Sequence, residues 1–203
     1  SVSSSGFAVD TDRDTLPDDW EIANGRDPLV ADYTIEINDQ GGCGWGDNGL
    51  VCWGFSLESP EFTNPVQLTS GSESGFCGTD TNKLECWGVQ MDYPPVRYDT
   101  KKASIGSYDI CSLGSAGVIC WASDGDPYSD IANWQDPSYP GLSNPVDVSV
   151  GFLDRIACAL DDTGAVCWGQ DFRENFSNLS NPVQISVGIN DVCALDDSGV
   201  RCW

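Results

Sequence analysis

Acidic side chains recur at every second position near the start of the sequence. The segment DTDRDTLPDDWE begins at residue 10 and has acids at its positions 1, 3, 5, 9 and 12, with a leucine at position 7. Carboxylates spaced in this way point into a curled loop, where the position-7 carbonyl adds an oxygen and the last carboxylate reaches back. Hard oxygen ligands select Ca²⁺. The sequence therefore predicts a calcium site whose ligands are Asp10, Asp12, Asp14, Leu16, Asp18 and Glu21.

The acidic segment has two known counterparts. Its ligand spacing is that of an EF-hand loop, although Thr15 stands where an EF-hand has the glycine of its sharp turn. Over residues 10–32 the sequence resembles more closely the thrombospondin type 3-like calcium repeats of bacterial surface proteins. That resemblance implies a short helix over 17–24, with Pro17 in its first turn and Gly25 as its stop. The alternative interpretation is an acidic, solvated tail.

Ten cysteines form five pairs, and eight residues separate the two members of every pair. Metal sites and redox motifs use C-x-x-C, commonly with histidines, and this sequence contains no histidine. The spacing favours disulfides, each of which would contribute about 2–3 kcal/mol by closing a short loop. The predicted bridges are Cys43–Cys52, Cys77–Cys86, Cys111–Cys120, Cys158–Cys167 and Cys193–Cys202.

Each cysteine pair brackets a predicted β-hairpin. Turn-forming residues lie between the cysteines, as GDNG at 46–49, LGSAG at 113–117, DDTG at 161–164 and DDSG at 196–199. The glycine supplies the positive φ of a tight turn, and Asp, Asn and Ser cap it. The second copy, DTNK at 80–83, lacks the glycine. Cysteines placed symmetrically about such a turn face each other across two antiparallel strands.

Alternation of side chains assigns the two faces of each hairpin. One face carries the cysteines and is predicted to be buried with Leu50, Leu84, Val118, Ala165 and Val200. The opposite face carries a tryptophan directly after each second cysteine, namely Trp53, Trp87, Trp121, Trp168 and Trp203. The residue after each first cysteine is always small, which leaves room for a neighbouring sheet. Core packing is the favoured role of the tryptophans, and a ladder of rings that stacks on a ligand is the alternative.

The cysteine hairpin belongs to a longer repeat. The segments at 64–71, 144–151 and 181–188 read NPVQLTSG, NPVDVSVG and NPVQISVG, and each is predicted to be a strand that begins at its proline; IEIN at 35–38 aligns with them. First cysteines are 34, 34, 47 and 35 residues apart, so the unit is about 35 residues with one insertion. Three short strands per unit favour an all-β, disulfide-stapled propeller. We expect an N-terminal segment over 1–33 and a five-repeat domain over 34–203.

The repeat also resembles a known family over residues 34–203. The recurring phrase V-x-V-G-x-x-x-x-C-A-L-D-D-S-G-V-R-C-W is similar to the repeat of the regulator of chromosome condensation superfamily, in the disulfide-bearing form of extracellular bacterial proteins. The resemblance implies a propeller, and propellers of that family usually have seven blades. Five repeats therefore predict either a five-bladed ring or part of a longer protein. Family repeats often carry a histidine two residues before the first cysteine, where this chain has Gly41, Gly75, Asp109, Ile156 and Asp191.

The composition narrows the possible partners. The 203 residues include 32 acids against 9 Lys and Arg, for a formal net charge of -23. Nucleic acids and anionic membrane surfaces repel such a chain, whereas cations are natural partners. No apolar run is long enough to span a bilayer, and the absence of a signal segment at Ser1 leads us to expect a mature or trimmed chain. Disulfides place it outside the cytosol, so the nucleotide-exchange and chromatin activity of the namesake is not expected.

The sequence predicts a binding protein and no enzyme. It has no histidine, no Gly-rich phosphate loop and no cysteine outside the five pairs. The insertion at 122–141 carries Tyr128, Trp134 and Tyr139 among several aspartates, which suits a cation, glycan or protein, or an irregular loop stabilised by its own aromatics. The first hypothesis is a secreted or cell-surface, calcium-binding repeat protein that serves in adhesion, binding or scaffolding. The alternatives are a self-assembling subunit of a filament or surface layer, which docks through its N-terminal segment, and a carbohydrate-binding lectin.

Overall fold

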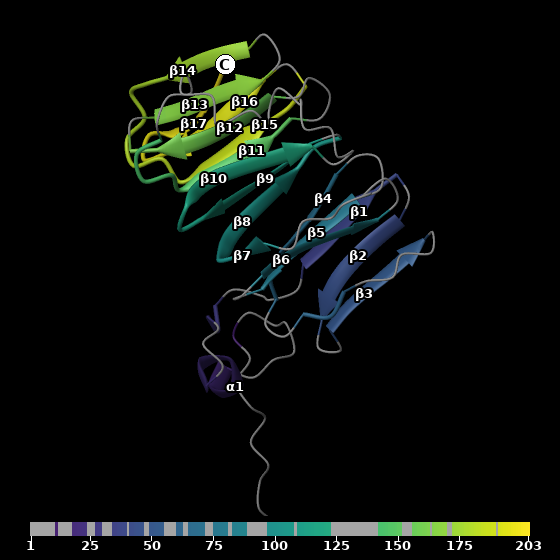
Figure 1. Ribbon diagram of the computed structural model, residues 1–203. Helices are drawn as coiled ribbons and strands as arrows, with labels where there is room; N and C mark the ends of the chain where they lie inside the picture. The colour runs from purple at the N-terminus through teal and green to yellow at the C-terminus, as the bar shows by residue number, and fades with distance from the viewer. Residues whose placement is uncertain are drawn as a thin grey trace, which may run out of the picture.

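Five antiparallel sheets follow one another in an arc in the computed structural model of the chain (Figure 1). A short helix, α1 (Asp18–Ala23), lies apart from the sheets and within the segment where the sequence predicts one. The structure describes residues 11, 18–23, 27–29, 34–39, 41–46, 49–54, 60–62, 65–71, 75–80, 83–88, 97–107, 109–122, 142–151, 156–162, 164–169, 172–189 and 191–203.

Each sheet is a simple meander in which neighbouring strands in the chain are neighbours in space. We call the sheets blades and number them along the chain. Blade 1 contains β1 (Thr34–Asn38), β2 (Gly41–Gly46) and β3 (Gly49–Gly54); blade 2 contains β4 (Pro65–Ser70), β5 (Gly75–Asp80), β6 (Lys83–Gly88) and β7 (Arg97–Tyr98); blade 3 contains β8 (Thr100–Ile105), β9 (Asp109–Gly114) and β10 (Gly117–Ala122); blade 4 contains β11 (Asp147–Val150), β12 (Ile156–Asp161), β13 (Gly164–Gly169) and β14 (Phe172–Phe176); blade 5 contains β15 (Gln184–Val187), β16 (Val192–Asp196) and β17 (Gly199–Cys202). The first strands of successive blades contact one another.

Two blades have a fourth strand that the sequence analysis does not predict. The strand β7 pairs with β6, and β14 pairs with β13, so each forms the outer edge of its sheet. The prediction of three strands per unit rests on the repeated phrase, and β7 and β14 lie outside it. Their sequences, RY and FRENF, have no counterpart in the other repeats.

All five predicted disulfides are formed. In every blade the two cysteines are directly opposite in the antiparallel register, with Cα atoms 4.0–4.1 Å apart, as the symmetric placement about a turn predicts. The hairpin glycines Gly117, Gly164 and Gly199 adopt the expected positive φ, at 93°, 137° and 110°. The structure thus confirms the repeated unit as a stapled hairpin.

The predicted starts of two first strands are wrong by two residues. The strands β11 and β15 begin at Asp147 and Gln184, after the Asn-Pro-Val of each repeat. The reason is that Asn144 and Asn181 adopt left-handed φ values of 51° and 48°, so the chain bends before the strand begins. Blade 2 differs, since β4 begins at its proline, Pro65, as predicted.

The core lies between the blades. Each blade has a disulfide face, which carries the cysteine pair, and a tryptophan face, which carries the tryptophan after it. At all four junctions the disulfide face of one blade packs against the tryptophan face of the next. Between blades 3 and 4, for example, Cys111 and Cys120 belong to one buried cluster with Val148, Val150 and Trp168. Both faces of an internal blade are therefore covered, as in stacked sheets.

The predicted burial holds for internal blades and fails at the two ends of the arc. On the disulfide faces Leu84, Val118 and Ala165 are buried and Leu50 is half-buried, but Val200 is 69 % exposed. Among the tryptophans, Trp87 and Trp168 are buried and Trp121 is half-buried, whereas Trp53 and Trp203 are 46 % and 39 % exposed. The prediction of a buried ring in every repeat is therefore wrong in both terminal blades. Trp53 lies on the tryptophan face of blade 1, which no described blade covers. Trp203 lies on the covered face of blade 5 and stacks on Phe176 of blade 4, with ring centroids 4.6 Å apart, but it stays partly exposed.

Candidate functional site

Polar side chains on the first strands connect each blade to the next. One position of the repeat lies four residues before the glycine that follows the first strand. It is occupied by Gln67, Lys102 and Asp147 in blades 2, 3 and 4. The Gln67 side chain donates to the Ala103 carbonyl at 2.9 Å and accepts from the Ala103 amide at 2.8 Å. The side-chain ammonium of Lys102 lies 2.5 Å from the Asp147 carboxylate. The position thus forms a ladder of inter-blade contacts.

Asp147 ties three blades together. Its side chain is buried, with one oxygen next to Lys102 of blade 3 and the other accepting the Ile185 amide of blade 5 at 2.8 Å. The amide of Val148 donates to it as well, at 2.7 Å. A buried carboxylate is costly unless opposite charge and hydrogen bonds compensate it, and here both are present. The sequence analysis did not identify this residue. The difference from Gln67 and Gln184, which stand at the same position in two other repeats, could have pointed to it.

A second row of contacts runs beside the ladder. The hydroxyl of Ser104 accepts the Val150 amide at 3.0 Å, and the hydroxyl of Ser149 accepts the Val187 amide at 3.1 Å. The strand ends approach still more closely, since a Cβ added at Gly106 would lie 2.5 Å from the Gly151 carbonyl oxygen. Glycine is required at this position because no side chain fits between the two strand ends.

Buried aspartates fix the hairpin turns of blades 4 and 5. Asp161 accepts the Gly164 amide of its turn at 3.2 Å and the Ser143 amide before β11 at 2.8 Å. Asp196 does the same in blade 5, where it accepts the Ser198 amide at 2.8 Å and the Ser180 amide at 2.9 Å. The first aspartate of each Asp-Asp pair therefore anchors the bend before the first strand to the turn of the same hairpin.

The environment of Asp196 favours its charged form. The pKa of its carboxyl lies below its ordinary value, and the largest cause is the hydrogen bond that the Ser198 hydroxyl donates at 2.5 Å. The amides of Ser180 and Ser198 and the charge of nearby Arg201 lower the pKa further, whereas desolvation partly opposes the shift. A guanidinium nitrogen of Arg201 lies 4.0 Å from the carboxylate. At neutral pH the carboxylate is therefore a hydrogen-bond acceptor, which suits a structural anchor.

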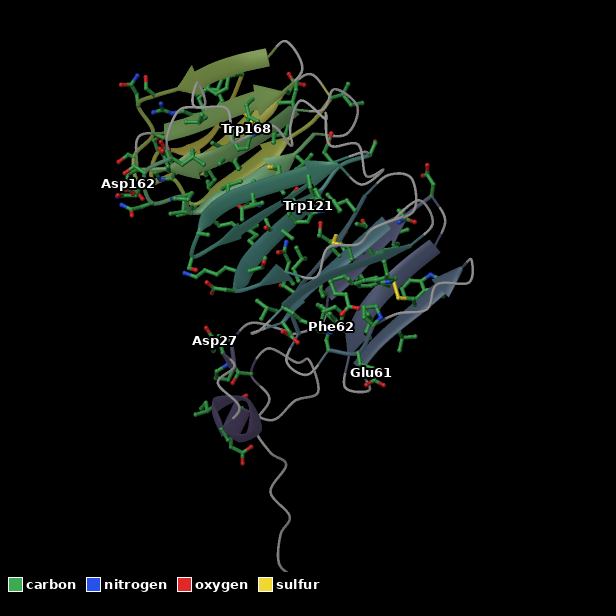
Figure 2. All side chains as sticks on the ribbon, viewed as in Figure 1. Asp27, Glu61, Phe62, Trp121, Asp162 and Trp168 are labelled. Carbon is green, nitrogen blue, oxygen red and sulfur yellow. A yellow bond between two sulfur atoms is a disulfide. The ribbon has the colours of Figure 1, made fainter. Side chains whose placement is uncertain are left out.

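The second aspartate of each Asp-Asp pair is exposed and bonds to the asparagine of the bend. Asn144 donates to Asp162 at 2.7 Å, and Asn181 donates to Asp197 at 2.6 Å. Figure 2 labels Asp162, which lies at the rim of the arc. The two aspartates of each DDTG or DDSG phrase therefore have structural roles, because the first bonds to the turn and the bend and the second bonds to the asparagine of the bend.

Most of the predicted calcium ligands lie outside the described residues, namely Asp10, Asp12, Asp14 and Leu16, and so does the side chain of Glu21. Asp18 is described, at the first residue of α1. Its two oxygens accept the amide and the hydroxyl of Thr11 at 2.7 and 2.6 Å, so Thr11 lies next to the first residue of α1. Within the described residues no group of three or more Cys, Asp or Glu is placed to hold a metal ion.

The other predicted binding residues, Tyr128, Trp134 and Tyr139, lie outside the part of the chain that the structure describes. No helix among the described residues has the length and hydropathy to cross a membrane.

Exposed apolar side chains gather on the two terminal faces of the arc. The tryptophan face of blade 1 exposes Ile35, Ile37, Val51 and Trp53, and in β1 exposed and half-buried positions alternate strictly. The disulfide face of blade 5 exposes Val200, and Cys202 is exposed beside it. The corresponding cysteines of blade 4 are buried. The tryptophan face of blade 1 therefore exposes four large apolar side chains, and the disulfide face of blade 5 exposes one.

Comparisons with known proteins place the fold. No family model and no curated protein sequence matches the chain. Among solved structures, human WBSCR16 superposes with a TM-score of 0.65 at 12 % identity over 87 % of this chain and 62 % of that one. The ectodomain of the receptor kinase CR4 from Physcomitrella patens gives 0.62 at 20 % identity, over 88 % and 52 %. Prp20p from Saccharomyces cerevisiae, which is yeast RCC1, gives 0.55 at 12 % identity, over 81 % and 54 %.

The fold is that of the RCC1-like propellers. These similarities concern fold alone, because every identity is low. The chain spans between about half and two thirds of the length of these proteins, in agreement with five blades where the sequence resemblance implies seven. The RCC1-like arc here is stapled in every blade by a disulfide.

Proposed function

We propose that the protein is an extracellular, non-catalytic module that binds a protein partner, with the propeller as a rigid support for its loops. One observation carries this proposal above the others. The buried carboxylates of the described blades anchor turns or join neighbouring blades, as Asp147, Asp161 and Asp196 do, and all ten cysteines are bridged. In the described blades, these carboxylates and cysteines are committed to the framework, which supports a non-catalytic role.

The same framework supports an extracellular location. Five disulfides persist only where thiols are not kept reduced, and small stapled hairpins are typical of secreted proteins. One of the structurally similar proteins is a receptor ectodomain. The work on Prp20p concerns its binding to Gsp1p and histones, which supports proteins as a partner class for this fold.

Calcium at the acidic segment is the second part of the proposal. The proposed ligands are Asp10, Asp12, Asp14, Leu16, Asp18 and Glu21, of which Asp18 is the first residue of α1. A bound Ca²⁺ would neutralise carboxylates that otherwise repel one another and would stiffen the junction with the propeller. The bonds from Thr11 to Asp18 support a closed loop of this kind.

The binding proposal is tested by capture with the aromatic insertion altered. Biotin-labelled protein is crosslinked to the surface of the source cells, and enriched proteins are identified for the wild type and for a Tyr128→Ala, Trp134→Ala, Tyr139→Ala variant. The control is Val66→Ala, Val146→Ala, Val183→Ala, because these side chains are exposed in three different blades. We expect the wild type and the control to enrich the same proteins and the insertion variant to lose them.

Two results would contradict the proposal. If the wild type enriches no protein above a mock-labelled sample, the protein-binding role is wrong. If enrichment disappears after the captured surface is deglycosylated, the partner is a glycan and the lectin alternative replaces a protein partner.

A further inference from the structure

Every disulfide of the chain lies within a single blade, so none of them joins one blade to the next. One rung of the polar ladder between blades has a chemistry of its own. Between blades 3 and 4 the side-chain amine of Lys102 meets the carboxylate of Asp147, whereas blade 2 presents an uncharged amide, Gln67, at the same position. This rung therefore brings a nucleophile next to a carboxyl carbon.

Asp147 is placed as the electrophile of a condensation. Its side chain is 1 % exposed, and Nζ of Lys102 lies 2.5 Å from its Oδ1 atom. The amide of Val148 donates to Oδ1 at 2.7 Å, and the amide of Ile185 donates to Oδ2 at 2.8 Å. Backbone donors on both oxygens stabilise the negative charge that develops there when a nucleophile adds to the carboxyl carbon.

The strands that carry the pair are fixed to each other. The strands β8 and β11 are in contact, and the Ser104 hydroxyl accepts the Val150 amide at 3.0 Å on one side of the pair. The residue after Lys102 is held as well, because the Gln67 side chain bonds to both backbone groups of Ala103. The amine and the carboxyl group are therefore kept together by the fold, which gives them a high effective concentration.

Burial supplies a driving force for condensation. A buried carboxylate and the ammonium beside it both lose hydration, and their attraction offsets that cost only in part. Condensation replaces the two charges by one neutral amide, which is less costly to bury when it is hydrogen-bonded. The Lys102 side chain is 37 % exposed, so the water molecule that is released has a path to solvent.

We propose that Lys102 and Asp147 condense to an intramolecular isopeptide bond that ties blade 3 to blade 4. A proton first passes from Nζ to Oδ1, which turns the ion pair into an amine and a carboxylic acid. The Nζ–Cγ bond then forms and the Cγ–Oδ1 bond breaks. Oδ1 leaves as water with two of the three ammonium hydrogens, and the third stays on the amide nitrogen. Oδ2 becomes the carbonyl oxygen and keeps the Ile185 amide as its donor.

A second ion pair of the chain serves as an internal comparison. Lys83 and Glu85 are also 2.5 Å apart, but their side chains are 27 % and 29 % exposed and both belong to one strand, β6. Water that reaches a carboxylate stabilises its charge, so the driving force described for Asp147 is weaker at Glu85. We expect this pair to remain an ion pair.

Intact mass tests the bond. The full chain is produced in an oxidising compartment, reduced, and measured by mass spectrometry as the wild type, Lys102→Arg and Lys83→Arg. Arginine keeps the positive charge but is not deprotonated to a nucleophile, so both variants should fold, which circular dichroism checks. We expect the wild type and Lys83→Arg to be lighter than their sequences by one water molecule, and Lys102→Arg to have its full mass.

Digestion locates the bond in the wild type alone, so it does not depend on the folding of a variant. The segment between Lys102 and Asp147 contains five further aspartates. Trypsin together with a protease that cleaves before aspartate therefore separates the two residues in a chain that lacks the bond. With the bond in place, two peptides stay joined after reduction, and tandem mass spectrometry should find fragments of both in one precursor ion.

Three results would overturn the proposal. A wild type of full mass shows that Lys102 and Asp147 form an ordinary ion pair. A deficit of one water molecule that persists in Lys102→Arg belongs to another group, such as a cyclised aspartate. A deficit that disappears in Lys83→Arg and persists in Lys102→Arg assigns the bond to Lys83 and Glu85. The proposal does not involve calcium or a partner, so its failure would leave the proposed function as it stands.

Discussion

Buried acids at single positions determine how the blades of this protein hold together. Asp147 is the clearest case, because one carboxylate bonds to its own blade and to both neighbours. The same position is occupied by Gln67, Lys102 and Gln184 in other blades. This position thus carries a long or charged polar side chain in blades 2 to 5, and in blades 2, 3 and 4 that side chain reaches the next blade. Blade 1 has Thr34 there.

Asp196 yields a prediction about pH. Its pKa is lowered in the folded chain, mainly by the Ser198 hydroxyl, so folding favours the ionised form. The stabilisation is present above the ordinary aspartate pKa of about 3.9 and is lost as pH falls through the folded value. We expect the melting temperature of the wild type to fall more steeply than that of Asp196→Asn between about pH 5 and about pH 2.

Thermal unfolding followed by circular dichroism measures this difference. The control is Asp191→Asn, which removes a carboxylate from an exposed position of the same blade. If the melting temperatures of the wild type and Asp196→Asn fall by the same amount across this pH range, the Asp196 anchor does not contribute to acid sensitivity.

Among the elements, the ends of the first strands approach the next blade closely. A Cβ at Gly106 would lie 2.5 Å from a backbone oxygen of the next blade, whereas the equivalent Gly188 faces open space. We expect Gly106→Ala to lower the free energy of unfolding by about 1–3 kcal/mol, because backbone must shift to admit the methyl group. Gly188→Ala should be nearly neutral. Guanidinium denaturation of both variants under identical conditions measures the difference, and equal stability of the two would contradict the proposed close approach.

The hairpins show what a sequence pattern can and cannot predict. The five disulfides, their register and the buried Leu84 follow from spacing and alternation, which are local properties of one repeat. The exposure of Val200 and Trp53 does not, since it depends on whether a neighbouring blade exists. The outer strands β7 and β14 were missed for a related reason, because they occur in single copies and pair with an edge that any strand can extend.

The candidate site was less predictable than the fold. The spacing of acids from Asp10 to Glu21 predicts a calcium ion and its ligands. Of these ligand side chains, the structure describes only that of Asp18. The exposed terminal faces were not predicted, because each repeat viewed alone has two apolar faces. Only the three-dimensional order of the blades identifies which two remain uncovered.

For the whole molecule, calcium binding is the direct test of the N-terminal segment. Isothermal titration calorimetry should detect one Ca²⁺ per chain, and Asp12→Asn, Asp14→Asn should abolish the heat, because two central ligands are then neutral. The control Asp39→Asn, Glu61→Gln removes the same charge from exposed positions outside the segment and should bind as the wild type does. Equal binding by both double variants would show that the spaced acids are not the ligands.

The uniform order of faces has a consequence for how such chains change in length. Because every junction joins a disulfide face to a tryptophan face, recombination that duplicates or deletes one whole unit of about 35 residues brings together two blades that already fit. The new neighbours would need only a side chain of the right reach at the position of Gln67 and a glycine at the position of Gly106. Natural variants that differ by one repeat should therefore be tolerated by the fold, with curvature of the arc deciding which repeat numbers close on themselves.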